Sequence, residues 1–357
     1  MTKTVNTVCA LIATKNGATT LTETINNASV QTDVFVVSDG STDDTASVAE
    51  AAGASVLELV ENVGKPAALR EGFRQLGLGA YDAIIVLDDD TRLAPDFVTE
   101  AMLVFDKHPE SVAVSGKTMS DWLPEQRWNG WVGARALGYW RYNWGVKVGQ
   151  SALKAITVLP GSNTMFRAQT FGTLLERDVE YIVDDTQWCL DIQTKKMGRI
   201  VHTSYAKAYV QDPASLREYY KQMLRWMWGT FQGIRGHRIG RRLSWFSVAY
   251  SALILDWLLY VLVWPVFLAV IGWKAYQGNN LEWFILGYLG GYFIWCAIAG
   301  AFLRQWRLPL LMPWVLAIDW VNRVIFIHAF VKAWRQPVVD SCKWVSPTRH
   351  ATKEART

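Results

Sequence analysis

Two long apolar segments near the carboxyl end limit what this chain can fold into. Residues 244–272 and 281–303 are each long enough to cross a hydrocarbon core of roughly 30 Å. Residues before about 235 carry an ordinary globular mixture of side chains, so the 51% hydrophobic content averages two different parts. We predict a globular domain over residues 1–235 and a membrane region over residues 243–335.

Arginines lie on the outer sides of both spans. Arg304 and Arg307 follow the second span, whereas the loop between the spans holds one cation, Lys274. The first span is preceded by Arg235, Arg238, Arg241 and Arg242. Because loops rich in Lys and Arg stay in the cytoplasm, we expect a multi-pass protein of the cell membrane with its large domain in the cytoplasm. Residues 1–7 are short and polar, and we expect no signal peptide there.

A third apolar stretch, residues 308–331, carries polar side chains. Asp319 and Arg323 are four residues apart, so they can pair on one helical face and lower the cost of charge in a membrane. This stretch is either a third span or an interfacial helix. The basic tail at residues 336–357 is expected in the cytoplasm and favours the interfacial alternative.

The first half of the chain alternates short apolar strands with helical patterns. Such alternation predicts an α/β fold with a mostly parallel, Rossmann-like sheet that is covered on both faces. The expected strands are residues 8–13, 34–37, 55–60 and 84–87. Ligands of such sheets bind at the carboxyl ends of the strands, which makes the residues after each strand the candidate site.

Acidic residues follow two of these strands directly. Asp39 comes after the second strand, and Asp88-Asp-Asp90 comes after residues 84–87. Carboxylates spaced as in Asp88 and Asp90 can hold Mg²⁺ or Mn²⁺ against a diphosphate, because these cations prefer oxygen ligands. Solvated loops and calcium sites also contain such acids, and a capped turn would account for the residues that follow Asp39 but not for its place at the strand end.

Two further charged motifs lie in predicted turns. Lys65, in Asn62-Val-Gly-Lys65, precedes a helix whose dipole it opposes, so contact with an acid or a phosphate would explain it. The spacing is not that of a Walker A loop. Asp184 and Asp185 precede a helical run at 187–197, where they either stabilise the helix start or supply a general base for an acceptor hydroxyl.

Gln222-Met-Leu-Arg225-Trp226 lies in a helical run from 215 to 231. Its amide, guanidinium and indole share one helical face and could orient a hydroxyl, neutralise a diphosphate and stack on a sugar. The alternative is an amphipathic interfacial helix that precedes the membrane.

Composition excludes some functions. The net charge of +4 comes without a basic stripe, so we expect no nucleic-acid partner. The four cysteines share no metal-ligand spacing. Residues 122–150 hold five tryptophans that either stack on a sugar or pack against membrane or domain, and we favour packing.

Taken in order, these motifs resemble family 2 glycosyltransferases with the GT-A fold, in particular the membrane-integrated hyaluronan, cellulose and chitin synthase-like group. The matching segments are 38–44, 62–65, 88–90, 161–163, 183–185 and 222–226. The resemblance implies an inverting glycosyltransferase that moves a sugar from a nucleotide-sugar, expected to be UDP-linked, to a lipid or a growing β-linked glycan at the cytoplasmic face.

The resemblance also implies roles for donor-side residues. Asp39 would contact the nucleotide, Lys65 and Asp88 would support the diphosphate, and Asp90 with Asp88 would bind Mg²⁺ or Mn²⁺. Thr14, at the end of the first strand, is expected among the donor-binding residues.

On the acceptor side, Asp185 matches the catalytic base and Asp184 is expected at the acceptor. Gln222 and Trp226 would bind the acceptor, while Arg225 would face the donor diphosphate.

The chain departs from the family pattern at two points. Val183-Asp184-Asp185 stands where the family has Thr-Glu-Asp, and the amino-terminal membrane helices of the large processive synthases are missing. Two other functions stay open: a polyprenyl-phosphate sugar transferase, and a non-catalytic membrane sensor that binds nucleotide-sugars.

Overall fold

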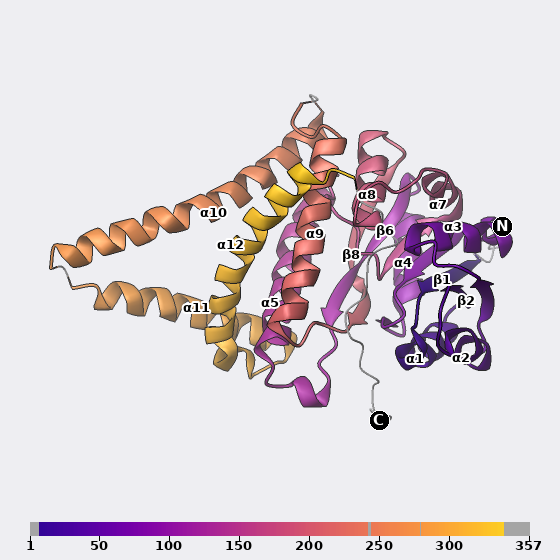
Figure 1. Ribbon diagram of the computed structural model, residues 1–357, viewed down its shortest axis with the longest axis horizontal. Coiled ribbons are helices and arrows are strands. Elements are labelled where there is room, and N and C mark those ends of the chain that lie inside the picture. Colours follow the sequence, from indigo (N-terminus) through magenta and orange to yellow (C-terminus); the bar gives the residue numbers. More distant parts are fainter. Residues whose placement is uncertain (1–6, 242–243, 279, 339–357) are drawn as a thin grey trace.

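The computed structural model describes residues 7–241, 244–278 and 280–338. A mixed β-sheet with helices on both faces forms the first part of the chain, and a group of long helices forms the second (Figure 1). Residues 1–6 and most of the predicted basic tail lie outside the described residues. The α/β domain and the carboxyl-terminal helices therefore appear in the order that the sequence predicts.

The sheet has eight strands in the order β3-β2-β1-β4-β7-β6-β8-β5. The strands are β1 (Val8–Thr14), β2 (Asp33–Asp39), β3 (Ser55–Leu59), β4 (Ala83–Leu87), β5 (Arg92–Leu93), β6 (Ser111–Ser120), β7 (Thr164–Arg167) and β8 (Arg199–Val210). β3, β2, β1 and β4 are parallel, as predicted, whereas β7 runs antiparallel to both β4 and β6. β5 is antiparallel to β8. The sheet is thus mixed, with the predicted strands forming its parallel half.

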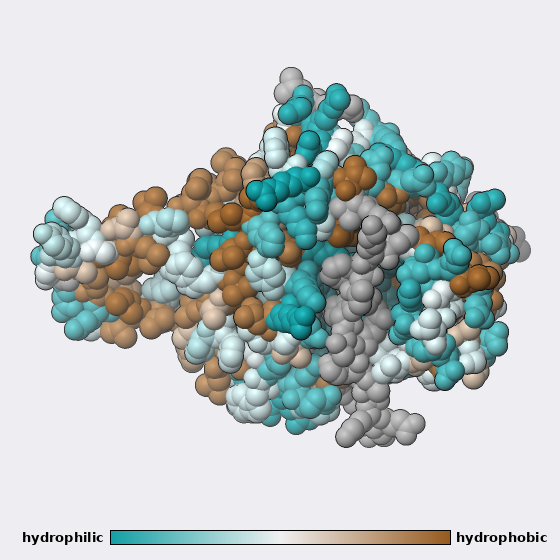
Figure 2. Space-filling model, viewed as in Figure 1, coloured by the Kyte–Doolittle hydropathy of each residue, from teal (hydrophilic) through white to brown (hydrophobic). Residues whose placement is uncertain are grey.

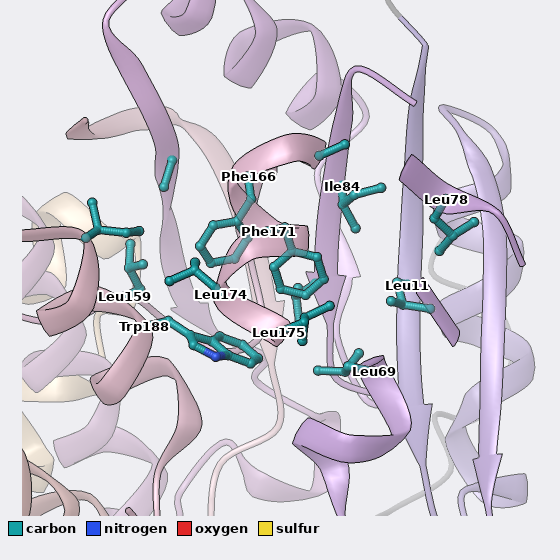
Figure 3. Close-up of a cluster of buried hydrophobic side chains, with 14 of the residues drawn as sticks. Leu11, Leu69, Leu78, Ile84, Leu159, Phe166, Phe171, Leu174, Leu175 and Trp188 are labelled. Atoms are coloured by element: carbon teal, nitrogen blue, oxygen red, sulfur yellow. The ribbon is translucent and has the colours of Figure 1, made fainter. Parts of the chain in front are cut away.

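Helices cover both faces of the sheet because alternate residues of its strands are buried on opposite sides. In β1, Leu11 belongs to one apolar cluster and Ile12 to the other, and both are fully buried. Helices α3 (Lys65–Gln75), α7 (Ala168–Leu175) and α8 (Asp184–Thr194) complete the first cluster, which Figure 3 shows around Phe166, Phe171 and Trp188. The second cluster is covered by α1 (Ala18–Ser29), α2 (Thr45–Ala51) and α4 (Phe97–Lys107). Burial on both sides explains the continuous apolar runs.

Three helices are long and apolar enough to cross a membrane. α10 (Trp245–Tyr276) and α11 (Glu282–Leu303) project from the sheet as a hairpin, and their surface is largely hydrophobic (Figures 1 and 2). The third apolar segment comprises a 3₁₀ turn (Leu308–Leu311) and α12 (Met312–Arg335). The third predicted segment thus has the length and composition of a span.

Helix α9 (Leu216–Gly236) lies between the sheet domain and the long helices (Figure 1). Phe231 of α9 packs edge-on against Phe326 of α12, with ring centres 5.0 Å apart. The hydroxyl of Tyr219 donates a hydrogen bond to Asn322 of α12 at 3.0 Å. The helix that carries the Gln222–Trp226 motif is therefore fixed to the third apolar helix.

The tryptophan-rich stretch forms α5 (Gly130–Arg141), a π-helical turn (Tyr142–Val146) and α6 (Lys147–Ala152). Trp140 contacts Trp295 of α11 at 5.1 Å between ring centres, and Trp131 contacts Trp314 of α12 at 5.7 Å. Trp131 and Trp140 therefore pack against the long helices, as expected for the tryptophans of this stretch.

Candidate active site

A single cavity of about 1060 Å³ lies at the carboxyl ends of β1, β2 and β4 and continues between α9 and the long helices. Every residue predicted for the site lines it: Thr14, Asp39, Lys65, Asp88, Asp90, Asp184, Asp185, Gln222, Arg225 and Trp226. The fold thus brings together motifs that are more than 200 residues apart in sequence.

Asp39 ends β2 and is held by the backbone of a neighbouring loop. Its Oδ1 accepts a hydrogen bond from the N–H of Val63 at 2.7 Å, and its Oδ2 accepts one from Gly64 at 2.9 Å. Burial raises the pKa of Asp39 above its ordinary value, and these two donors oppose that rise. Gly40 has φ +59°, and a Cβ there would come within 2.5 Å of the Asn62 nitrogen, so the turn requires glycine.

The three acids after β4, Asp88 to Asp90, all line the cavity, and Asp89 is the most buried of them. Asp88 forms an ion pair with Lys65, the first residue of α3. Burial opposes the charge of Lys65, but the carboxylates of Asp88 and Asp184 raise its pKa above the ordinary value. Asp89 is 1% exposed, and the Thr14 hydroxyl donates a hydrogen bond to its carboxylate. Asp89 and Thr14 therefore hold the loop in place.

Asp185 lies in the first turn of α8, which begins at Asp184, three residues earlier than the predicted helical run. Its Oδ2 accepts a hydrogen bond from the N–H of Gly161 at 3.0 Å. A Cβ on Gly161 would lie 3.0 Å from this oxygen and 3.7 Å from Nζ of Lys65, so glycine lets the carboxylate and the cation approach. Burial, together with Asp184, raises the pKa of Asp185 to about 7. A carboxyl with that pKa can accept a proton near neutral pH.

Gln222, Arg225 and Trp226 present one face of α9 to the cavity. Burial lowers the pKa of Arg225. The carboxylates of Asp184 and Asp185 attract the guanidinium and offset part of that effect. α9 therefore closes the cavity opposite the strand ends and adds a cation to it.

A stripe of polar residues in the tryptophan-rich stretch forms another wall of the cavity. Its members, Arg135, Tyr139, Asn143 and Lys147, are spaced by four. In a regular α-helix this spacing drifts around the axis, and the wider π-helical turn between Arg141 and Lys147 counteracts the drift. This wall was not predicted from the sequence, although polar residues repeated at i, i+4 indicate one polar face of a helix.

The far end of the cavity is lined by polar groups of the long helices. Tyr260, Tyr292 and Asp319 all face it. Arg323 Nη1 lies 2.7 Å from Oδ2 of Asp319, which confirms the predicted pair. The hydroxyl of Tyr292 donates to the same oxygen at 3.2 Å, and the hydroxyl of Tyr260 also donates to Asp319. The apolar helices therefore carry a hydrogen-bonded cluster where they border the cavity.

The carboxylates of the cavity fit a hard divalent cation. Asp88 and Asp90 supply the oxygen ligands that Mg²⁺ and Mn²⁺ prefer. Within the part of the chain that the structure describes, no three His, Cys, Asp or Glu side chains gather closely enough to hold a metal by themselves. A cation here would therefore take its remaining ligands from water and from a bound diphosphate.

Residues 83–321 match the model of a family described as "Glycosyl transferase family group 2". A comparison with curated protein sequences found no match.

A solved structure of a glycosyltransferase shares the fold. A mannosyltransferase from Pyrobaculum calidifontis, in complex with GDP-Man and Mn²⁺, is 18% identical, with a TM-score of 0.57 over 88% of this chain and 86% of that one. TarS residues 1–349 from S. aureus, in complex with UDP-GlcNAc, is 14% identical, with a TM-score of 0.49 over 92% of each chain.

Proposed function

This chain belongs to glycosyl transferase family group 2, and we propose that it transfers a sugar from a nucleotide-sugar, with UDP as the expected nucleotide, to a lipid or β-linked glycan acceptor. We place the reaction at the cytoplasmic face of the membrane and propose that it inverts the anomeric carbon. The mannosyltransferase of similar fold is described with GDP-Man and Mn²⁺, which supports a nucleotide-sugar donor and a divalent cation.

One observation carries the proposal. Asp185 shares a single cavity with the cations Lys65 and Arg225 and with the indole of Trp226. A base, a diphosphate-neutralising pair and a stacking surface are the groups that glycosyl transfer needs around one reacting centre. A sensor that only binds nucleotide-sugars would need no base with a pKa near neutrality.

The reaction follows from this arrangement. Asp185 takes the proton from an acceptor hydroxyl while the hydroxyl oxygen bonds to the anomeric carbon on the face opposite the diphosphate. The bond from the anomeric carbon to the diphosphate oxygen breaks, and its electron pair leaves with the nucleoside diphosphate. Lys65 and Arg225 neutralise the charge that develops on that leaving group.

Asp88 and Asp90 would hold Mg²⁺ or Mn²⁺ at the donor end of the cavity. When bound, the cation supplies additional positive charge to the leaving diphosphate. Asp39 would accept hydrogen bonds from the nucleoside, and Thr14 supports the donor site through Asp89. Gln222 and Trp226 would bind the acceptor, with Asp184 beside them.

The acceptor is proposed to reach Asp185 from the end of the cavity that the long helices line. Tyr260, Tyr292 and Asp319 offer hydrogen bonds there, while the outer surface of the hairpin is apolar (Figure 2). These properties suit a molecule with a hydroxyl-bearing part and an apolar part, and they equally suit a glycan that is attached to a membrane component.

The test uses the full chain in detergent. Wild type and Asp185→Asn are incubated with Mn²⁺, a membrane lipid extract and a panel of radiolabelled nucleotide-sugars. Released nucleoside diphosphate and label in lipid and polymer fractions are measured. Asp106→Asn, an exposed acid on α4 outside the cavity, is the matched control.

We expect one donor to be turned over by wild type and by Asp106→Asn, with a loss of at least about 1000-fold in Asp185→Asn. The labelled fraction then identifies the acceptor as lipid or polymer. Donor binding without turnover in wild type, unchanged in Asp185→Asn, would overturn the proposal in favour of a sensor.

A further inference from the structure

Lys147 places a buried positive charge in the wall of the cavity. The residue is 2% exposed, and its Nζ donates a hydrogen bond to Oγ of Ser115 at 2.8 Å. Among the residues that the structure describes, no carboxylate lies within 4.0 Å of this nitrogen. An ammonium has three donors and is costly to bury without a counter-ion. The Tyr142 ring, whose centre lies 5.6 Å from Nζ, is a further contact of the ammonium but carries no net charge. Lys147 therefore holds a buried positive charge without a directly paired carboxylate.

The groups around Lys147 do not supply a fixed negative charge. Burial lowers the pKa of His202 to about 3, so this imidazole is neutral, and burial raises the pKa values of the Tyr142 hydroxyl and the Cys189 thiol, so these are neutral as well. Asp185 is the acid whose field reaches Lys147. Burial lowers the pKa of Lys147 to about 8, so the ammonium is still charged at neutral pH.

Lys147 is separate from the cations that face the diphosphate. Lys65 begins α3 and pairs with Asp88, and Arg225 lies on α9. Lys147 begins α6, at the end of the Arg135–Lys147 stripe, and hydrogen-bonds to Ser115 of β6. An anion at Lys147 would therefore meet a different wall of the cavity from the one that carries the Lys65–Asp88 pair.

We propose that Lys147 binds a carboxylate or phosphate group that is carried by the transferred sugar or by the acceptor. The inference rests on the proposed function and adds a chemical class to it: one of the two substrates is anionic close to the reacting centre. Asn143, four residues before Lys147, and Thr157 also line the cavity and carry neutral hydrogen-bonding groups.

The test compares substrates that differ in one anionic group. Donor pairs are UDP-glucose with UDP-glucuronic acid and GDP-mannose with GDP-mannuronic acid. Acceptor pairs are a polyprenol with the matching polyprenyl phosphate. Each pair is assayed with wild type, Lys147→Met and Lys147→Arg. Lys117→Met, a half-buried lysine on β6 that lies outside the cavity, is the matched control, and thermal unfolding checks that each variant folds.

Wild type is expected to prefer the anionic member of one pair by roughly 10- to 100-fold in kcat/KM, the range of a charge-assisted hydrogen bond. The preference should fall to about 1 in Lys147→Met and persist in Lys147→Arg and Lys117→Met. A preference in the donor pairs assigns the anion to the sugar, and one in the acceptor pairs assigns it to the acceptor.

Equal use of both members by wild type would overturn the inference, as would a preference that Lys147→Met retains. If wild type turns over no donor at all, the proposed function itself fails. The two failures are therefore distinguishable in one experiment.

Discussion

The guanidinium carbon of Arg135 lies 4.5 Å from the centre of the Trp226 indole ring. Arg135 is 7% exposed, and the centre of the Tyr139 ring lies 4.4 Å from the same carbon. Its Nε lies 3.2 Å from Oδ1 of Asp212, which is also buried. A wall residue of α5 thus supports the indole that α9 presents to the cavity, and we regard Arg135 as a positioning residue for Trp226.

Replacing Arg135 by Met should destabilise the protein by roughly 3–5 kcal/mol, because Asp212 would stay buried without its partner. The double variant Arg135→Met, Asp212→Asn should recover part of that loss. Thermal unfolding in detergent measures both, and the KM for the acceptor of the double variant shows whether Trp226 has moved. An unfolding temperature for Arg135→Met equal to that of wild type would contradict this account.

Gly161→Ala should slow the reaction without unfolding the protein. The new Cβ would meet Oδ2 of Asp185 at 3.0 Å and push the carboxylate from its position. We expect a fall in kcat of about 10- to 100-fold, since small displacements of catalytic groups have effects of this size. Gly149→Ala is the matched control, because its Cβ would meet no atom within 4 Å. Equal kcat values for both variants would rule out this steric role.

The pH dependence of kcat/KM should follow the ionisation of Asp185. With its pKa raised to about 7, the rate is expected to rise about tenfold per pH unit below 7 and to level off above it. A profile that is already flat at pH 5 would show that a different group, or no base, limits the reaction.

Asp185 should also affect stability in a defined pH window. Between its unfolded pKa near 3.9 and the folded value of about 7, the unfolded chain has lost the proton that the folded chain keeps. The contribution of Asp185 to stability is therefore full below pH 4 and falls as the pH rises to 7. Asp185→Asn should unfold several degrees above wild type at pH 8, with no such gain at pH 4.

Removal of divalent cations should abolish turnover. With EDTA we expect a loss of at least about 100-fold, since a bound cation contributes several kcal/mol to a charged transition state. Mn²⁺ or Mg²⁺ should restore the rate, and Asp90→Asn should need about tenfold more cation. Asp44→Asn, an exposed acid next to α2, should behave as wild type. Full activity in EDTA would exclude a role for the metal.

Local patterns predicted the parts of the site that sit at strand ends. Asp39 and Asp88 each follow a continuous apolar run, which is typical of a parallel strand that is buried on both faces. The carboxyl ends of parallel strands lie at one edge of the sheet, so the two aspartates were expected close together. The Gln222–Trp226 face was also foreseeable from helical spacing. The roles proposed for these residues remain predictions.

Other features depend on contacts that no local pattern encodes. The support of Trp226 by Arg135 links residues 91 positions apart, and Asp212 joins them from the end of β8. The π-helical turn has no simple sequence signature. Without it, the polar residues from Arg135 to Lys147 are not expected on one face of the helix, so the stripe was not predicted. The antiparallel β7 was missed because its four residues give no signal of direction.

The cavity has a further consequence for how the protein must be handled. Part of its wall belongs to α10, α11 and α12, whose outer surfaces are apolar. In the membrane location that we propose, lipid or detergent surrounds those surfaces, and its thickness and lateral pressure act on the spacing of Tyr260, Tyr292 and Asp319. The width of the acceptor end is then a property of the protein together with its surrounding amphiphile, and kinetic constants will be comparable only between preparations that share the same one.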